Sequence, residues 1–209
     1  MTDWTRGTAP PWLNVSSETL GRLDGLLSLV EKWNPAINLV AAGTLPAAWQ
    51  RHVLDSAQLF ALAPPTARHW ADFGSGAGFP GLVIAAMAKD ATSTLRITLV
   101  ESDKRKAVFL LQASRDLGLA VEVLTDRAEV LPSLAADVIS ARALAPLTDL
   151  CMLAKRHLAA DGLALFPKGA QADQELADAA TQWRFDAQPI QSHTDPAGRI
   201  FLLKNIRHA

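Results

Sequence analysis

The first third of the chain has the apolar spacing of helices. Apolar residues recur at intervals of three and four over 16–33, which predicts an amphipathic helix capped by Ser16 or Ser17. Pro35 is expected to help end it, since proline breaks a helix interior. A second helix is expected over 46–60, with its proline at the first turn. The N-terminal part of the chain is therefore predicted to be helical.

Beyond residue 65, short apolar runs alternate with helical stretches, which is typical of βαβ units and a parallel sheet. Helices are expected over 80–89, 104–117 and 147–157. Strands are expected in HWADFG, RITLVES, VEVLTD, DVISARAL and LALFPKG, and the last two in WRFDAQPI and RIFLLKNI. The chain thus predicts an α/β domain over 66–209 behind a helical N-terminal extension over 1–65.

The stretch ADFGSGAGFPG lies where a predicted strand meets a predicted helix. Its glycines are Gly74, Gly76, Gly78 and Gly81. Backbone N–H groups and the positive end of the following helix would face a ligand there, which favours a nucleotide-like molecule. A tight structural turn is the alternative, because glycine permits one anywhere.

Two acidic residues bear on which nucleotide-like ligand fits. Glu101 ends the next predicted strand, where a ribose hydroxyl would be held, and the glycine spacing also satisfies the dinucleotide fingerprint. Asp72, however, stands two residues before the first glycine and would repel a pyrophosphate. The ammonium and sulfonium of S-adenosylmethionine would be attracted instead. This cofactor, with S-adenosylhomocysteine as its product, is therefore favoured over a dinucleotide.

Composition limits the partners and the compartment. The formal net charge of −1 excludes a generally basic surface, so any RNA contact must come from a local patch. The single cysteine, Cys151, cannot form an internal disulfide, and no zinc spacing is present, so no metal is expected. The longest apolar stretch is far shorter than a membrane span. A cytoplasmic protein without an obligate protein partner is expected.

Five stretches together resemble one bacterial family. They are WNPAINLV with RHVLDS, DFGSGAGFPG, VESDKRKAVFL, DVISARAL and FPKG, and they span residues 33–169. In this order and spacing they are similar to the small-subunit rRNA methyltransferase G family, also called GidB. The resemblance implies a class I S-adenosylmethionine-dependent methyltransferase fold, Rossmann-like with a seven-stranded sheet. It also implies transfer of a methyl group to N7 of a guanine in 16S rRNA, within the small ribosomal subunit or its assembly intermediates.

The loop chemistry and the resemblance together give the candidate site residues. Arg142 is the candidate for positioning the acceptor, because the end of the fourth strand borders the point of methyl transfer in this fold; an ion pair with Asp72 or Glu129 is the alternative. The cofactor candidates are Asp72, Gly74, Gly76, Gly78, Phe79, Glu101, Ala128, Glu129 and Arg142.

Substrate candidates are polar or basic. The resemblance suggests that His52, Asp55 and Ser56, on one face of the second predicted helix, close the pocket. A solvated helix face is the alternative for these three residues. The basic ones would grip phosphates, while ordinary surface charge is the alternative. The set is Asn38, His52, Asp55, Ser56, Lys104, Arg105, Lys106 and Lys168.

The expected reaction needs little acid–base chemistry. Guanine N7 has an in-plane lone pair and no proton, so an aligned direct displacement suffices. Cys151 lies inside a predicted helix, so a covalent nucleophile is not expected. Three competitors stay open from the residues alone: a small-molecule methyltransferase on the same fold, a nicotinamide-dependent oxidoreductase, and a non-catalytic RNA-binding module.

Overall fold

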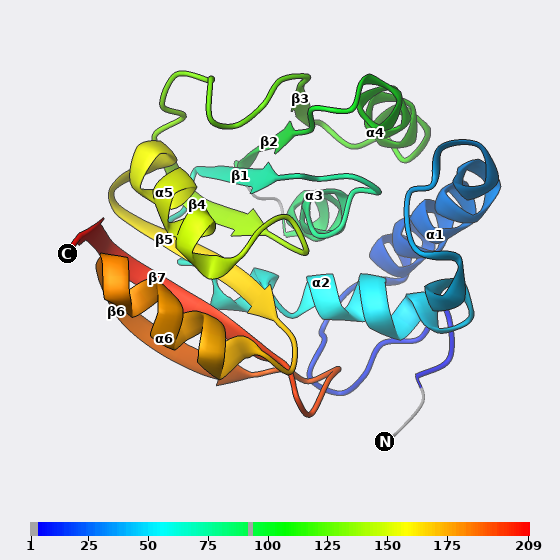
Figure 1. Cartoon of the computed structure of the whole chain (residues 1–209). Helices are drawn as coiled ribbons and strands as arrows, with labels where there is room; N and C mark the ends of the chain where they lie inside the picture. The colour runs from blue at the N-terminus through cyan, green and yellow to red at the C-terminus, as the bar shows by residue number, and fades with distance from the viewer. Residues whose placement is uncertain (1–3, 92–93) are drawn as a thin grey trace.

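The computed structural model describes residues 4–91 and 94–209, which are built around one seven-stranded sheet (Figure 1). The strand order is β3-β2-β1-β4-β5-β7-β6. Neighbours run parallel from β3 to β5, whereas β7 is antiparallel to both β5 and β6. The predicted mostly parallel sheet is confirmed. The strands are β1 His69–Phe73, β2 Arg96–Val100, β3 Glu122–Leu124, β4 Ala136–Ala141, β5 Leu158–Lys168, β6 Trp183–Gln191 and β7 Arg199–His208.

Helices cover both faces of the sheet, so the central strands are buried on both sides (Figure 1). On one face lie α1 Ser17–Ile37, α3 Gly81–Asp90 and α4 Lys104–Asp116. On the other lie α5 Leu147–His157 and α6 Ala172–Gln182, the latter not predicted from the sequence. Each face has its own apolar cluster. Of the described helices, none combines the length and apolarity that crossing a membrane requires.

The first predicted helix forms, but it ends later than expected. Ser16 is the N-cap, and its side chain accepts a hydrogen bond from the Thr19 N–H at 3.0 Å. The expectation that Pro35 ends the helix is wrong, because the helix continues past it to Ile37. Asn38 ends it instead, in the left-handed conformation with φ 52° that suits a helix C-terminus.

The second predicted helix is broken into short turns. Where 46–60 was expected to be continuous, the chain forms a 3₁₀ turn at Ala42–Ala47, a π-helical turn at Trp49–Leu54, a short α2 at Asp55–Ala57 and a further 3₁₀ turn at Phe60–Leu62. The Ser56 hydroxyl bonds back to the carbonyl of His52 at 2.5 Å within this region. Such a side-chain bond competes with regular helix geometry, and π turns often mark functional sites.

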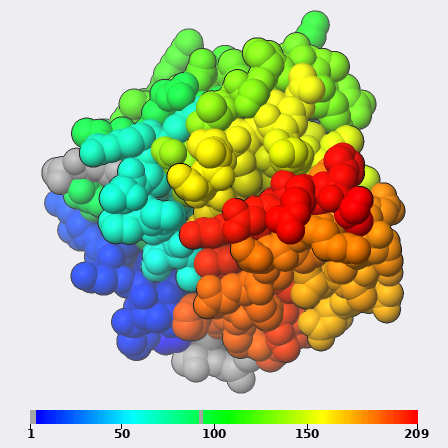
Figure 2. Space-filling model, turned by 90° about the vertical axis from the view of Figure 1, so that its left-hand side faces the viewer, coloured from blue at the N-terminus to red at the C-terminus, as the bar shows by residue number. Residues whose placement is uncertain are grey.

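The N-terminal helix shares a core with the sheet. Leu23, Leu26, Leu27 and Val30 of α1 are at most 2% exposed and belong to the same cluster as the buried residues of α3 and α4. Burying each such side chain stabilises the fold by roughly 1.5–3 kcal/mol relative to leaving it exposed. At the other end of the chain, Figure 2 shows the C-terminal residues, in orange and red, covering much of one face below the yellow and green segments. The division at residue 65 stays a prediction.

Candidate active site

The glycine-rich loop joins β1 to α3 and is anchored from below by Asp72. This carboxylate is fully buried; it accepts hydrogen bonds from Ser140 Oγ at 2.7 Å and from the Gly81 N–H at 3.1 Å. Burial raises the pKa of Asp72 to about 6. The expected direct attraction of a positively charged ligand does not fit this geometry, because both oxygens are turned into the protein. Asp72 instead ties the start of α3 to β4.

The loop itself needs glycine for two different reasons. Gly74, Gly76 and Gly78 have positive φ angles of 65°, 51° and 84°, which only glycine adopts readily. Gly81 has an ordinary φ, but a Cβ there would overlap Leu99 and lie 2.8 Å from Asp72 Oδ2. The loop can therefore pass close to the strand ends and keep its surface open for a ligand.

Glu101 follows β2 and braces the same loop. Its Oε2 accepts from the Gly76 N–H and its Oε1 from the Asp103 N–H, both at 2.8 Å. A carboxylate offers about four acceptor positions, so two hydrogen bonds leave room for a further pair from ligand hydroxyls. Glu101 is thus held in a fixed orientation beside the loop.

A cavity of about 480 Å³, called here the smaller cavity, opens beside Gly74. Ala128, Met152 and Leu153 contribute apolar walls, and the Glu129 side chain turns outward to Arg127 at 3.3 Å. The buried ring of His157 donates from Nε2 to the Ala128 carbonyl at 2.9 Å, which fixes the backbone of that wall. A flat apolar ring with polar edges fits such a space.

A larger cleft of about 1050 Å³ lies on the other side of the segment that follows β4. Leu144 and Ala145 line both spaces, so the 142–146 segment forms the wall between them. Leu144 is 42% exposed and covers Gly74, where an added Cβ would lie 2.7 Å from its Cδ1. The large cleft is lined further by His52 and Asp55 and by the hairpin over 192–200.

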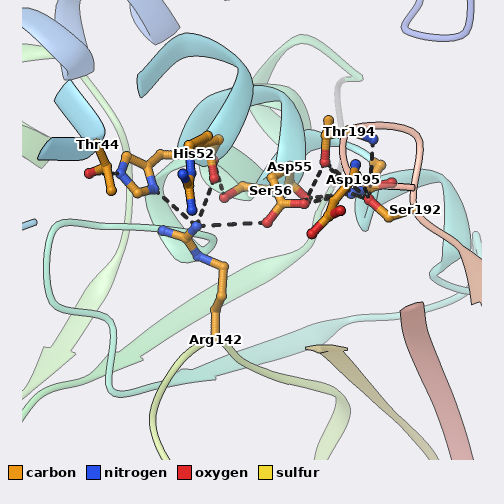
Figure 3. A network of polar contacts seen from close by, with 10 residues as sticks. Thr44, His52, Asp55, Ser56, Arg142, Ser192, Thr194 and Asp195 are labelled. Atoms are coloured by element: carbon orange, nitrogen blue, oxygen red, sulfur yellow. Dashed lines mark hydrogen bonds and ion pairs between the residues drawn. The ribbon is translucent and has the colours of Figure 1, made fainter. Parts of the chain in front are cut away.

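Arg142 enters this cleft from the end of β4 and joins three polar partners (Figure 3). Its Nη1 donates to the Arg51 carbonyl at 2.9 Å and to His52 Nδ1 at 3.1 Å, and lies 3.7 Å from Asp55 Oδ2. The guanidinium also stands 5.5 Å from the centre of the Phe79 ring. The structure therefore pairs Arg142 with Asp55, and the expected ion pairs with Asp72 or Glu129 do not form.

His52 is a neutral acceptor in this arrangement. Since Arg142 can only donate, Nδ1 of His52 accepts, so Nε2 carries the proton and donates to Thr44 Oγ1 at 2.8 Å. The Thr44 hydroxyl in turn donates a hydrogen bond to the Ala41 carbonyl at 2.7 Å. Burial, together with the positive charges of Arg142 and Arg51, lowers the pKa of His52 to about 4. The ring stacks on Phe79, with centroids 5.3 Å apart.

The C-terminal hairpin completes the cleft, and sequence reasoning assigned it nothing. Thr194 Oγ1 donates to Asp55 Oδ1 at 2.6 Å (Figure 3). Gln58 Nε2 donates to Asp55 Oδ1 at 2.9 Å and to Ser192 Oγ at 3.1 Å. The N–H of His193 donates to Gln58 Oε1 at 2.9 Å. Three segments far apart in the sequence thus meet at one polar network.

Comparisons with known proteins show the family of this chain. The family described as "rRNA small subunit methyltransferase G" matches residues 20–199. The chain is 50% identical to ribosomal RNA small subunit methyltransferase G of Cereibacter sphaeroides over 94% of its length and 95% of the relative. The protein of that name from Ruegeria pomeroyi is 49% identical over 93% and 95%. The chain belongs to the rRNA small subunit methyltransferase G family.

Solved structures support the same fold at much lower identity. A SAM dependent methyltransferase from Aquifex aeolicus superposes with a TM-score of 0.54 at 16% identity, over 77% of this chain and 93% of that one. A methyltransferase from Geobacter sulfurreducens gives 0.58 at 16% identity, over 91% and 96%. The fold is that of a class I S-adenosylmethionine-dependent methyltransferase, as the sequence resemblance implied.

Two basic substrate candidates of this rRNA methyltransferase are already paired. Lys168, with a side chain 9% exposed, bonds to Glu175 and the Ala145 carbonyl, both at 2.7 Å. Arg105 pairs with Asp103 at 3.1 Å on the surface. Lys168 therefore braces the wall segment, which does not fit the expectation that it grips phosphate.

The other candidates divide by position. Lys104 and Asn38 are exposed, and Asn38 acts as the C-cap of α1. Lys106 is half-buried at the start of α4, where its N–H is 3.4 Å from the capping carboxylate of Asp103. Ser56 is fully buried and bonds inward, so it supports His52 and does not face the cleft.

Cys151 lies inside a helix, as the sequence predicted. Cys151 lies fully buried in α5, and burial raises the pKa of its thiol to about 12, which makes it a poor nucleophile. The described residues hold no cluster of three or more histidine, cysteine or acidic side chains suited to a metal ion.

Proposed function

We propose that this chain transfers a methyl group from S-adenosylmethionine to N7 of a guanine in 16S rRNA, with the cofactor in and beside the smaller cavity and the guanine in the larger cleft. The substrate would be the small ribosomal subunit or an assembly intermediate, and the enzyme would act in the cytoplasm. The observation that carries the proposal is the position of Arg142. It enters the large cleft from a wall segment that also lines the smaller cavity.

The residues around the smaller cavity suit the cofactor. The Glu101 carboxylate has acceptor capacity left for ribose hydroxyls, and the apolar wall at Ala128 and Met152 suits an adenine ring. Gly74 and its neighbours leave the loop surface without side chains, so a ligand can approach the backbone closely. When bound, the cofactor supplies an electrophilic methyl group on a sulfonium.

The protein's own part in the reaction is positioning. Guanine N7 needs no base to remove a proton, so a general base is not required in the cleft. Arg142 would hold the base by donating to O6, and His52 and Phe79 hold Arg142 in place from behind. Neutral His52 keeps a second positive charge away from the guanidinium.

The size of the cleft favours a nucleotide over a small free metabolite. At about 1050 Å³ it is larger than a cavity that encloses a drug-sized molecule usually needs to be, and it is bordered by polar side chains. The near-neutral net charge indicates that ribosome geometry contributes to affinity, so free 16S rRNA is expected to be a poorer substrate.

The test is transfer of labelled methyl from S-adenosylmethionine to small subunits that lack this modification, followed by nucleoside analysis. Label in 7-methylguanosine of 16S rRNA supports the proposal. Absence of transfer to subunits and to free 16S rRNA, despite demonstrated cofactor binding, would exclude it and favour a small-molecule methyltransferase.

A further inference from the structure

The cleft holds an acid beside Arg142 that methyl transfer to N7 does not itself require. Asp55 Oδ2 lies 3.7 Å from Arg142 Nη1, which is too long for a hydrogen bond. The two side chains are 19% and 18% exposed, so each is largely buried yet still reaches the cleft. The Asp55 carboxylate and the Arg142 guanidinium therefore lie side by side with no hydrogen bond between them, so each can still bond to a ligand.

Neighbouring side chains hold only one oxygen of Asp55. Thr194 Oγ1 donates to Oδ1 at 2.6 Å and Gln58 Nε2 donates to the same oxygen at 2.9 Å. Within the described residues, Oδ2 accepts no hydrogen bond; its contact is the long ion pair with Arg142 (Figure 3). The carboxylate is thus fixed in orientation, with one oxygen able to accept from a ligand.

The guanidinium of Arg142, like the Asp55 carboxylate, is held by hydrogen bonds through one of its atoms. Its Nη1 serves the Arg51 carbonyl and His52. Among the contacts that the structure describes, its Nε and Nη2 form no hydrogen bond, although arginine carries five N–H donors in a planar fork. Donors therefore stay available in the cleft next to the Asp55 oxygen.

Guanine presents the complementary pattern on one edge. Its O6 accepts, while its N1–H and 2-amino group donate. Adenine presents the reverse pattern at the same two positions. Its 6-amino group donates where guanine O6 accepts, and its N1 accepts where guanine N1–H donates. A carboxylate placed against adenine N1 would face a lone pair, and an arginine placed against its amino group would face a donor.

We infer that Asp55 and Arg142 together read the Watson–Crick edge of the acceptor guanine, Arg142 donating to O6 and Asp55 Oδ2 accepting from N1–H and the 2-amino group. Thr194 is the positioning residue that turns Asp55 toward the cleft. The inference rests on the proposed function, since it takes the cleft to be the guanine site. It assigns Asp55 a part in choosing the base, beyond closing the pocket.

The experiment compares guanine with inosine, which lacks only the 2-amino group. Small subunits are reconstituted with 16S rRNA carrying either base at the modified position, and single-turnover methyl transfer is measured for the wild type and Asp55→Asn. The wild type should prefer guanine by about 10-fold, because losing a base contact of this kind costs a factor of this order. Asp55→Asn should be slower on guanine and should lose most of that preference, since its amide N–H₂ replaces the accepting oxygen.

Control variants separate base reading from folding. Asp195→Asn changes a carboxylate of the same hairpin, whose Oδ1 accepts from the Ala197 N–H, and should keep the guanine preference. Thr194→Ser retains the hydroxyl and should preserve the preference, whereas Thr194→Val should reduce it. Affinity for S-adenosylmethionine and the melting temperature are measured for each variant, so that a general loss of structure is recognised.

The outcomes are distinct. A wild-type enzyme that methylates guanine and inosine equally overturns the inference without any variant, and so does an Asp55→Asn enzyme with an unchanged guanine preference. A wild-type enzyme that transfers no methyl group to guanine-bearing subunits overturns the proposed function itself.

Discussion

Nη1 of Arg142 lies 3.1 Å from Nδ1 of His52, and this contact fixes the protonation state of the histidine. Because the arginine donates, the imidazole must accept at Nδ1 and stay neutral, with Nε2–H directed to Thr44. A chain of hydrogen bonds thus runs from the guanidinium through His52 and Thr44 to the Ala41 carbonyl. This chain of hydrogen bonds orients Arg142 in the cleft and links it to the irregular turns over 42–54.

Removing Arg142 should affect methyl transfer more than cofactor binding. Arg142→Ala is expected to lower kcat by roughly 100-fold, comparable to losing one preorganised donor in an enzyme site. Arg142→Lys keeps the charge but loses the planar fork, so a smaller loss is expected. Calorimetry should show nearly unchanged affinity for S-adenosylmethionine, because the residue lines the large cleft and not the smaller cavity. Loss of affinity in proportion to kcat would place Arg142 on the cofactor.

The neutral His52 predicts a pH dependence of stability. Its pKa is lowered to about 4 in the folded state from an ordinary 6.5, so between these values the unfolded chain binds more protons. Its contribution to the free energy of unfolding is therefore fully present above about pH 6.5 and is lost as pH falls toward 4. Urea unfolding between pH 4.5 and 7.5 should show a steeper acid loss for the wild type than for His52→Gln.

In the difference between wild type and His52→Gln, the contributions of other titrating groups to the pH dependence of stability cancel. Asp72, with a pKa raised to about 6, acts in the opposite direction, since the folded state binds more protons than the unfolded state between its ordinary 3.8 and 6. That effect is present in both proteins and cancels in the difference. Parallel curves for wild type and His52→Gln would show that His52 is not held neutral.

Gly81 should tolerate no side chain. A Cβ there would overlap Leu99 and lie 2.8 Å from Asp72 Oδ2, so Gly81→Ala is expected to cost about 1–3 kcal/mol of folding free energy through overpacking. Gly21→Ala is the matched control, because nothing lies within 4 Å of its added Cβ on α1. That control should be stabilised by about 0.5–1 kcal/mol. Equal effects of the two substitutions on chemical unfolding would refute the packing argument.

Glu101 and Glu129 should differ in their effect on cofactor affinity. Glu101→Gln is expected to weaken binding of S-adenosylmethionine by about 10-fold, because charge-assisted hydrogen bonds to loop and ligand become neutral ones. Glu129→Gln should have a smaller effect, since its carboxylate faces Arg127 on the surface at 3.3 Å. Titration calorimetry checks the order, and the reverse order would show that Glu129 carries the ligand contact.

The sequence predicted the central sheet well because its signals are local. The apolar runs from His69 to Lys168 and the alternating helices specify βαβ units, and the glycine loop has few alternatives. Cys151 could also be placed in a helix from its apolar neighbours. These parts depend on periodicity and on backbone limits, which are visible within a short window.

The remaining features depend on contacts between distant segments. The orientation of Asp72 depends on Ser140, which is 68 positions away, and the fixing of Asp55 depends on Thr194, at a separation of 139. The broken turns over 42–62 pack against Arg142 and the hairpin. Tertiary contacts of this kind override local helix preference, so no pattern in 46–60 could have revealed them.

The central claim is that the cofactor binds in and beside the smaller cavity and the guanine binds in the large cleft. A crystal structure with S-adenosylhomocysteine tests it most directly. The account predicts the adenine ring against Ala128 and Met152, the ribose hydroxyls at Glu101, and the sulfur facing the cleft that holds Arg142. Adenosine lying instead in the large cleft, against Asp55 and the hairpin, would contradict the assignment of donor and acceptor sites.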